Sequence, residues 1–88
     1  MRESARAKPE VIDALLARGH VHLQKGELDE AIADFTEVIA LDDKSAAAYH
    51  GRGLARTDKG DYAGARDDFA AALNRDPKLA AVPGRPAP

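Results

Sequence analysis

The chain has 88 residues, 44% of them hydrophobic and 32% charged, so it can form at most one small domain. Its 13 basic and 15 acidic residues give a net charge of -2, which is too balanced for a nucleic-acid-binding surface. The sequence contains no cysteine, which excludes disulfides, thiol nucleophiles and thiolate metal sites. No apolar run approaches the roughly 18 residues of a membrane helix, and the N-terminus lacks the apolar core of a secretory signal, so we expect a cytoplasmic protein without a membrane partner.

The first two predicted helices are separated by a glycine. Pro9 suits the first turn of a helix, and apolar residues then recur at three- and four-residue steps for about four turns. Gly26 suits the left-handed residue that closes this helix. A second helix should begin near Leu28 and end near Leu41. Its predicted apolar face consists of Leu28, Ala31, Ile32, Phe35, Val38 and Ile39.

A second pair of helices follows in the same style. Ser45 is expected to cap a helix over residues 46–59, which Gly60 closes. The fourth helix should run from about Tyr62 to Asn74, where the Asp-Pro sequence at 76–77 stops it. Alternation between apolar and polar residues never lasts long enough to predict a strand. We therefore expect an all-α fold of four helices in two antiparallel helix-turn-helix hairpins, preceded by a flexible segment at residues 1–8 and followed by a Pro-rich disordered tail at residues 80–88.

The two hairpins are copies of one unit. Residues 12–45 align with residues 46–79 without a gap and share ten identities in 34 positions, where chance would give roughly two to four. The clearest shared stretch, residues 25–35, returns as residues 59–69 with Lys, Gly, Ala, Asp and Phe at the same offsets. A helical hairpin with a period of 34 residues is typical of the tetratricopeptide repeat.

The chain resembles a pair of tetratricopeptide repeats over residues 12–79, within a predicted domain of residues 9–79. The resemblance implies that the hairpins stack as a short right-handed α-solenoid. It also implies that small residues mark the close approach of helices and that an aromatic residue fills each hairpin. These structural positions are Gly19, Ala31 and Phe35 in the first copy and Gly53, Ala65 and Phe69 in the second. The chain departs from the family where Asp43 replaces a proline and where Arg precedes each of the two glycines.

Those arginines recur together with two aspartates. We expect the ion pairs Arg18–Asp34 and Arg52–Asp68 to clamp each hairpin, with a ligand-binding arginine as the alternative.

The resemblance implies a ligand groove along the first helix of each hairpin. Its positions are Asp13, Leu16, His20, Leu23 and Gln24 in the first copy and Ala47, His50, Leu54, Thr57 and Asp58 in the second. Family members that grip the C-terminal carboxylate of a chaperone use Lys, Arg and Asn on these helices, and none of those residue types stands at these positions. We therefore predict a non-enzymatic module that binds a protein or peptide segment in this groove, without a cofactor and without a preference for chaperone tails.

Self-association is the alternative function. Val11, Leu16 and Leu23 are apolar residues of the first helix that no predicted element covers, and stacked repeats normally need about three copies for stability. The chain could therefore oligomerise through this face or belong to a longer repeat array. We expect the fourth helix to form the C-terminal end of the stack. The charged Arg66 and Arg75 stand there at the repeat positions of the apolar Ile32 and Leu41.

The sequence predicts neither a metal site nor a catalytic site. His20 and His50 could approach each other across the groove, but a catalytic zinc ion needs three protein ligands and the sequence suggests no third, so we predict no metal site. No Ser/His/Asp grouping, phosphate-binding loop or pocket of paired carboxylates is indicated, so we predict no enzymatic activity.

Overall fold

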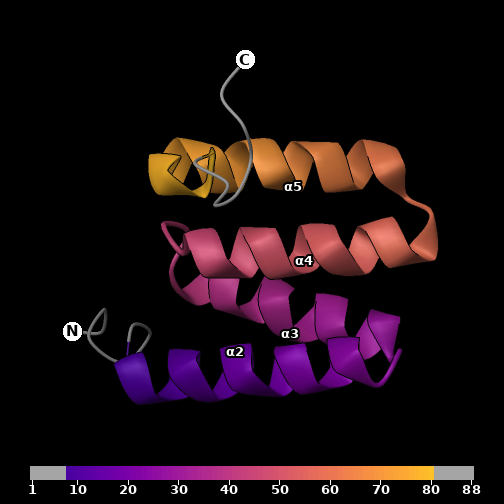
Figure 1. Cartoon of the computed structure of the whole chain (residues 1–88). Coiled ribbons are helices and arrows are strands. Elements are labelled where there is room, and N and C mark those ends of the chain that lie inside the picture. Colours follow the sequence, from indigo (N-terminus) through magenta and orange to yellow (C-terminus); the bar gives the residue numbers. More distant parts are fainter. Residues whose placement is uncertain (1–7, 81–88) are drawn as a thin grey trace.

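A computed structural model describes residues 8–80 of the chain; the predictions for residues 1–7 and 81–88 lie outside the described residues. Residues 8–80 form four α-helices and a short 3-10 helix (Figure 1). In chain order these are α2 (Pro9–Gln24), α3 (Leu28–Leu41), α4 (Ala46–Lys59), α5 (Tyr62–Arg75) and the 3-10 helix η1 (Pro77–Ala80). Each α-helix packs against the next in sequence, which confirms the predicted all-α fold of sequential hairpins.

The helix ends follow from local chemistry. Proline occupies the first position of α2, where its missing N–H costs nothing. Gly26 and Gly60 have φ of 80° and 89°, a left-handed backbone that side-chain-bearing residues disfavour. The Ser45 hydroxyl accepts a hydrogen bond from a backbone N–H in the first turn of α4, and Asp61 does the same for α5. The observed bounds of α4 are the predicted ones, and α5 extends one residue beyond its predicted end.

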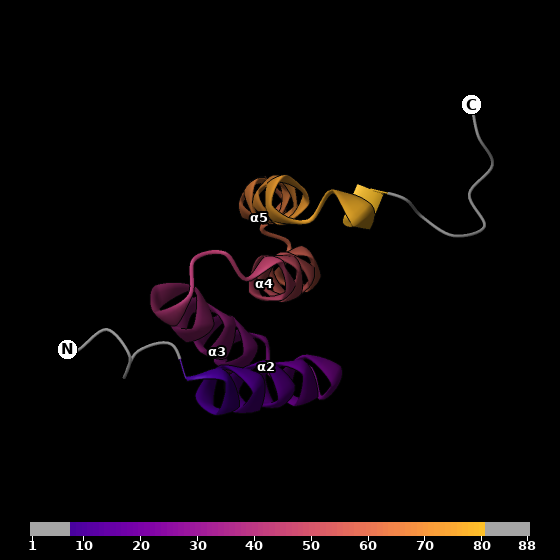
Figure 2. The same ribbon diagram turned by 90° about the vertical axis from the view of Figure 1, so that its left-hand side faces the viewer.

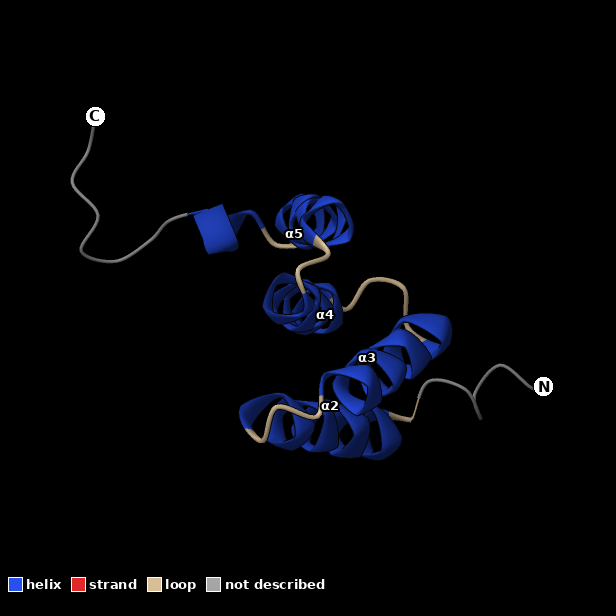
Figure 3. Cartoon of the chain, turned by 90° about the vertical axis from the view of Figure 1, so that its right-hand side faces the viewer, coloured by secondary structure: helices blue, strands red, loops and turns tan. Residues whose placement is uncertain are grey.

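The core lies across the first hairpin and α4. One cluster joins Leu15 of α2, Val38 of α3 and Ala48 of α4, and the other joins Ala31 and Phe35 of α3 to Ala55 of α4. Because each cluster includes α4, the second hairpin completes the core of the first. The stack is therefore one packed unit. Figures 2 and 3 view α4 and α5 nearly end-on, whereas α2 and α3 run obliquely to them.

Phe35 is held between two glycines. Its side chain is fully buried, and a Cβ atom built on Gly19 of α2 would lie 2.9 Å from the ring. A Cβ atom on Gly51 of α4 would lie only 2.5 Å from the same ring, closer than real contacts allow. In the second hairpin Gly53 makes the corresponding close approach to Phe69, at 2.7 Å. The glycines at 19 and 53 were predicted from the repeat; Gly51 was not, because it packs across the boundary between repeats.

One expectation for the outer face of α2 is wrong. Leu16 and Leu23 are not left uncovered; both are half-buried and pack against the cluster around Phe35, which α3 and α4 supply. The large apolar residues that α2 does expose are Val11 and Val21, at 45% and 52%. No helix among the described residues is long and apolar enough to cross a membrane.

Candidate functional site

Each hairpin is clamped by one arginine–aspartate pair. The Nε and Nη2 atoms of Arg18 donate to the two carboxylate oxygens of Asp34 at 2.9 and 2.8 Å. The same two atoms of Arg52 donate to Asp68 at 3.0 and 2.9 Å. Both aspartates are buried, so two-point arginine contacts satisfy charges that would otherwise be costly inside the fold. Both predicted ion pairs are present, and both arginines are used within the fold.

A second partner of the buried aspartate differs between the copies. In the second hairpin Arg56 also donates to Asp68, at 3.0 Å. In the first hairpin the equivalent residue is His22, whose Nδ1 lies 2.7 Å from Glu27 and whose Nε2 lies 3.7 Å from Asp34. His22 is half-buried.

These contacts shift the titration of the carboxyl groups. The hydrogen bond from Arg18 lowers the pKa of Asp34, although burial of the carboxyl acts in the opposite direction. The hydrogen bond with His22 lowers the pKa of Glu27. Both carboxyl groups therefore stay ionised at neutral pH and hold the network together.

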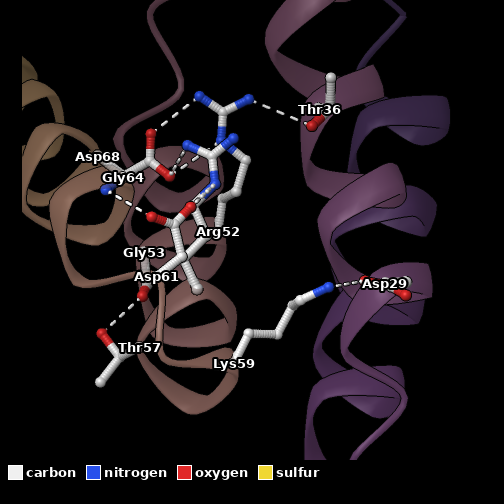
Figure 4. A network of polar contacts seen from close by, with 10 residues as sticks. Asp29, Thr36, Arg52, Gly53, Thr57, Lys59, Asp61, Gly64 and Asp68 are labelled. Carbon is white, nitrogen blue, oxygen red and sulfur yellow. Dashed lines mark hydrogen bonds and ion pairs between the residues drawn. The ribbon is translucent and has the colours of Figure 1, made fainter.

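Two further contacts tie α4 to the preceding repeat (Figure 4). The Nη1 atom of Arg52 donates to Thr36 of α3 at 3.2 Å, and the ammonium group of Lys59 donates to Asp29 of α3. Figure 4 shows Arg52 lying between α5 and α3, so that one guanidinium serves both its own hairpin and its neighbour.

The two histidines predicted for the groove each lie against an aromatic ring of their own hairpin. His20 meets Phe35 edge-on at 5.0 Å between ring centroids, and His50 meets Phe69 at 5.6 Å. Both histidines are half-buried. Across the described residues there is no group of three or more His, Cys, Asp or Glu side chains that could hold a metal ion.

The predicted groove positions lie on two helices that contact each other. Helices α2 and α4 run in the same direction, with α3 and α5 opposed to them (Figure 1). We call the ten predicted positions on these helices the α2/α4 face. The exposed members are Asp13, Gln24, Ala47, Leu54 and Asp58. The half-buried members are Leu16, His20, Leu23, His50 and Thr57.

One pair of contacting residues was not predicted from the sequence. The guanidinium carbon of Arg75 lies 4.4 Å from the centre of the Tyr49 ring, and its Nε atom donates to the carbonyl of Asp43 at 2.6 Å. In the first hairpin the equivalent residues are Leu15 and Leu41, which pack in one apolar cluster. The apolar pair has thus been replaced as a unit by a cation–aromatic pair. A comparison of both positions together between the two repeats, rather than of each position alone, would have predicted this replacement.

Comparison with known families agrees with this architecture. A family model described as tetratricopeptide repeat matches residues 3–85, and no curated protein matches the chain. Repeats of this family generally mediate protein–protein interactions and are typically non-catalytic. With four helices arranged as two hairpins and a match over nearly its whole length, the chain belongs to the tetratricopeptide repeat family.

Proposed function

We propose that this chain is a non-enzymatic interaction module that binds a protein or peptide segment along the α2/α4 face. The observation that carries the proposal is the exposure of Leu54. Helix α4 contacts α3, α5 and α2, which makes it the most surrounded helix of the fold. Leu54 nevertheless remains 37% exposed. An apolar side chain left open there is available to a ligand.

The rest of the face suits the same role. The imidazole of His20 lies against the fully buried ring of Phe35, and that of His50 lies against the half-buried ring of Phe69, so packing helps to position both histidines. Neither Arg–Asp pair is among the ten positions of the face, whereas Leu16 and Leu23 also pack against the core. Substitutions at the exposed positions Asp13, Leu54 and Asp58 should therefore change binding without unfolding the protein.

The α2/α4 face can be tested by selecting peptides from a random library on the intact chain. Binding of the selected peptides is then measured by fluorescence anisotropy. We expect Leu54→Glu to weaken binding by about ten-fold or more, because a buried apolar contact is replaced by a charge. Tyr62→Glu is the matched control, since Tyr62 is 69% exposed but lies on α5. Equal losses in the two variants, or no loss with Leu54→Glu, would contradict the proposal.

Self-association through α2 is a second candidate with an observation of its own. Val21 stands at the repeat position of Ala55, which is fully buried between α3 and α4. Val21 on α2 thus stands at the position through which α4 packs against the preceding repeat, but Val21 itself is exposed. A second copy of this chain, or a preceding repeat of a longer array, could cover it.

In a head-to-tail dimer, α5 of one molecule would pack against α2 of the next as α3 packs against α4. The residues at two of these positions differ from those of the α3–α4 contact. The position of Gly51, which admits the ring of Phe35, is held by Ala17 on α2. The partner of Lys59 on α3 is Asp29, but the equivalent residue on α5 is Ala63. Sedimentation at increasing concentration decides between the candidates. Dimers that disappear with Val21→Glu and persist with Tyr62→Glu would favour self-association.

A further inference from the structure

We infer that the α2/α4 face is built for a basic segment, a peptide with cationic side chains flanking an apolar one. This inference rests on the proposed function and specifies the chemistry of its ligand.

The cations of the two helices are already paired. Every Lys and Arg residue of α2 and α4 forms an ion pair with a carboxylate of the same chain. The pairs are Arg18 with Asp34, Arg52 and Arg56 with Asp68, and Lys59 with Asp29. An acidic ligand would have to compete with these internal carboxylates, or bind without a cation.

The carboxylates of the face remain available. Asp13 on α2 and Asp58 on α4 are exposed, and neither has an ion-pair partner within residues 8–80. Asp58 follows Leu54 by four residues, so the two side chains share one side of α4. The α2/α4 face therefore combines an exposed apolar side chain with unpaired negative charge.

Helix stability does not explain Asp58. It is the second-to-last residue of α4, where a negative charge opposes the helix dipole. The last residue, Lys59, has the favourable sign and is paired with Asp29 of the preceding repeat. A carboxylate kept at an unfavourable position, beside an exposed leucine, indicates a role in recognition rather than in folding.

The spacing sets the size of the ligand. The 34-residue repeat places Asp13 at the register of Ala47, and Ala47 and Asp58 are separated by about 16 Å along the helix. Leu54 lies between them. An extended peptide rises about 3.3 Å per residue, so the two cationic side chains must lie at least about five residues apart to span this axial distance, and the spacing between α2 and α4 adds to it.

The random peptide library offers a direct test, because it contains basic, neutral and acidic sequences alike. We expect the peptides selected by the intact chain to carry net positive charge around an apolar residue. Enrichment of acidic or neutral peptides would overturn this inference and leave the proposed function standing. Failure to enrich any peptide above background would overturn both.

Variants that neutralise the two aspartates of the face provide a second test. Asp13→Asn and Asp58→Asn should each weaken binding of a selected peptide by about two- to five-fold, the size expected for exposed ion pairs. Asp67→Asn, an exposed aspartate of α5, is the matched control and should leave the affinity unchanged. The losses should shrink as salt is raised, because exposed charges are screened. Unchanged affinity in both face variants, with melting curves showing that they are folded, would contradict the inference.

Discussion

The two hairpins have the same plan but are stabilised by different contacts. Phe35 in the first is fully buried, whereas Phe69, at the same repeat position, is only half-buried. The reason is position in the stack: α3 is packed between α2 and α4, but α5 has α4 on one side and the short η1 beside it. Val38 is fully buried at the corresponding interface, and its counterpart is the smaller Ala72.

The polar contacts show the opposite asymmetry. The side chain of Arg18 is 62% exposed, whereas that of Arg52 is 15% exposed. Arg52 reaches Thr36 of the preceding repeat, and Arg18 has no repeat before it among the described residues. The first hairpin therefore depends more on apolar packing and the second more on its ion cluster, although the sequence of one is a copy of the other.

The largest expected effect is on the aromatic pair. Phe35→Ala should reduce the free energy of unfolding by about 3–5 kcal/mol, because it empties a fully enclosed site. Phe69→Ala should cost clearly less, since part of its ring already contacts solvent. Urea denaturation of the two variants measures the difference. Equal losses would mean that position in the stack does not control the packing energy.

The buried carboxylates should show the reverse order. Asp68→Ala leaves two partly buried arginines without their partner and should cost about 3 kcal/mol. Asp34→Ala should cost less, because its main partner, Arg18, can turn into water. The same urea titrations apply, with Asp67→Ala as an exposed control. A larger loss for Asp34→Ala would contradict the assignment of the stronger clamp to the second hairpin.

Acid should weaken the first hairpin through Asp34. The hydrogen bond from Arg18 holds the pKa of Asp34 below its ordinary value of 3.8, so the ionised group contributes stability that is fully present above that pH. This contribution is lost as the pH falls below about 4, through the lowered pKa of the folded state. The urea midpoint of the wild type should therefore fall more steeply in acid than that of Asp34→Asn. Parallel acid profiles would exclude Asp34 as a source of the dependence.

The smallest effect concerns Asp58. Asp58→Asn removes a negative charge from the last turn of α4 and should raise stability by about 0.3–1 kcal/mol. Asp13→Asn, near the other end of a helix, should bring no gain. Thermal melting of the two variants provides the comparison. A loss of stability in Asp58→Asn would show that the carboxylate serves the fold.

The sequence predicts contacts within a repeat better than contacts between repeats. The helices, the closing glycines and both Arg–Asp pairs were predictable because they recur at one period. Gly51 was not, because its contact with Phe35 crosses the repeat boundary. Leu16 was placed on an open face because its cover by α4 depends on how the hairpins stack.

The candidate site was predictable only in part. Family resemblance supplied the ten positions, but residue identity alone could not show which of them the fold leaves exposed. The pairing of the remaining α4 cations, Arg56 and Lys59, also needed the structure, because their carboxylate partners come from neighbouring helices. That pairing is what distinguishes a face suited to basic ligands from one with a balanced charge.

In the proposed function, both hairpins contribute one helix to a shared binding face. Amide chemical shifts recorded while a selected peptide is added to the intact chain test it most directly. We predict shift changes on α2 around His20 and on α4 around Leu54, saturating together at one affinity. Changes confined to α5, or to one hairpin alone, would contradict it.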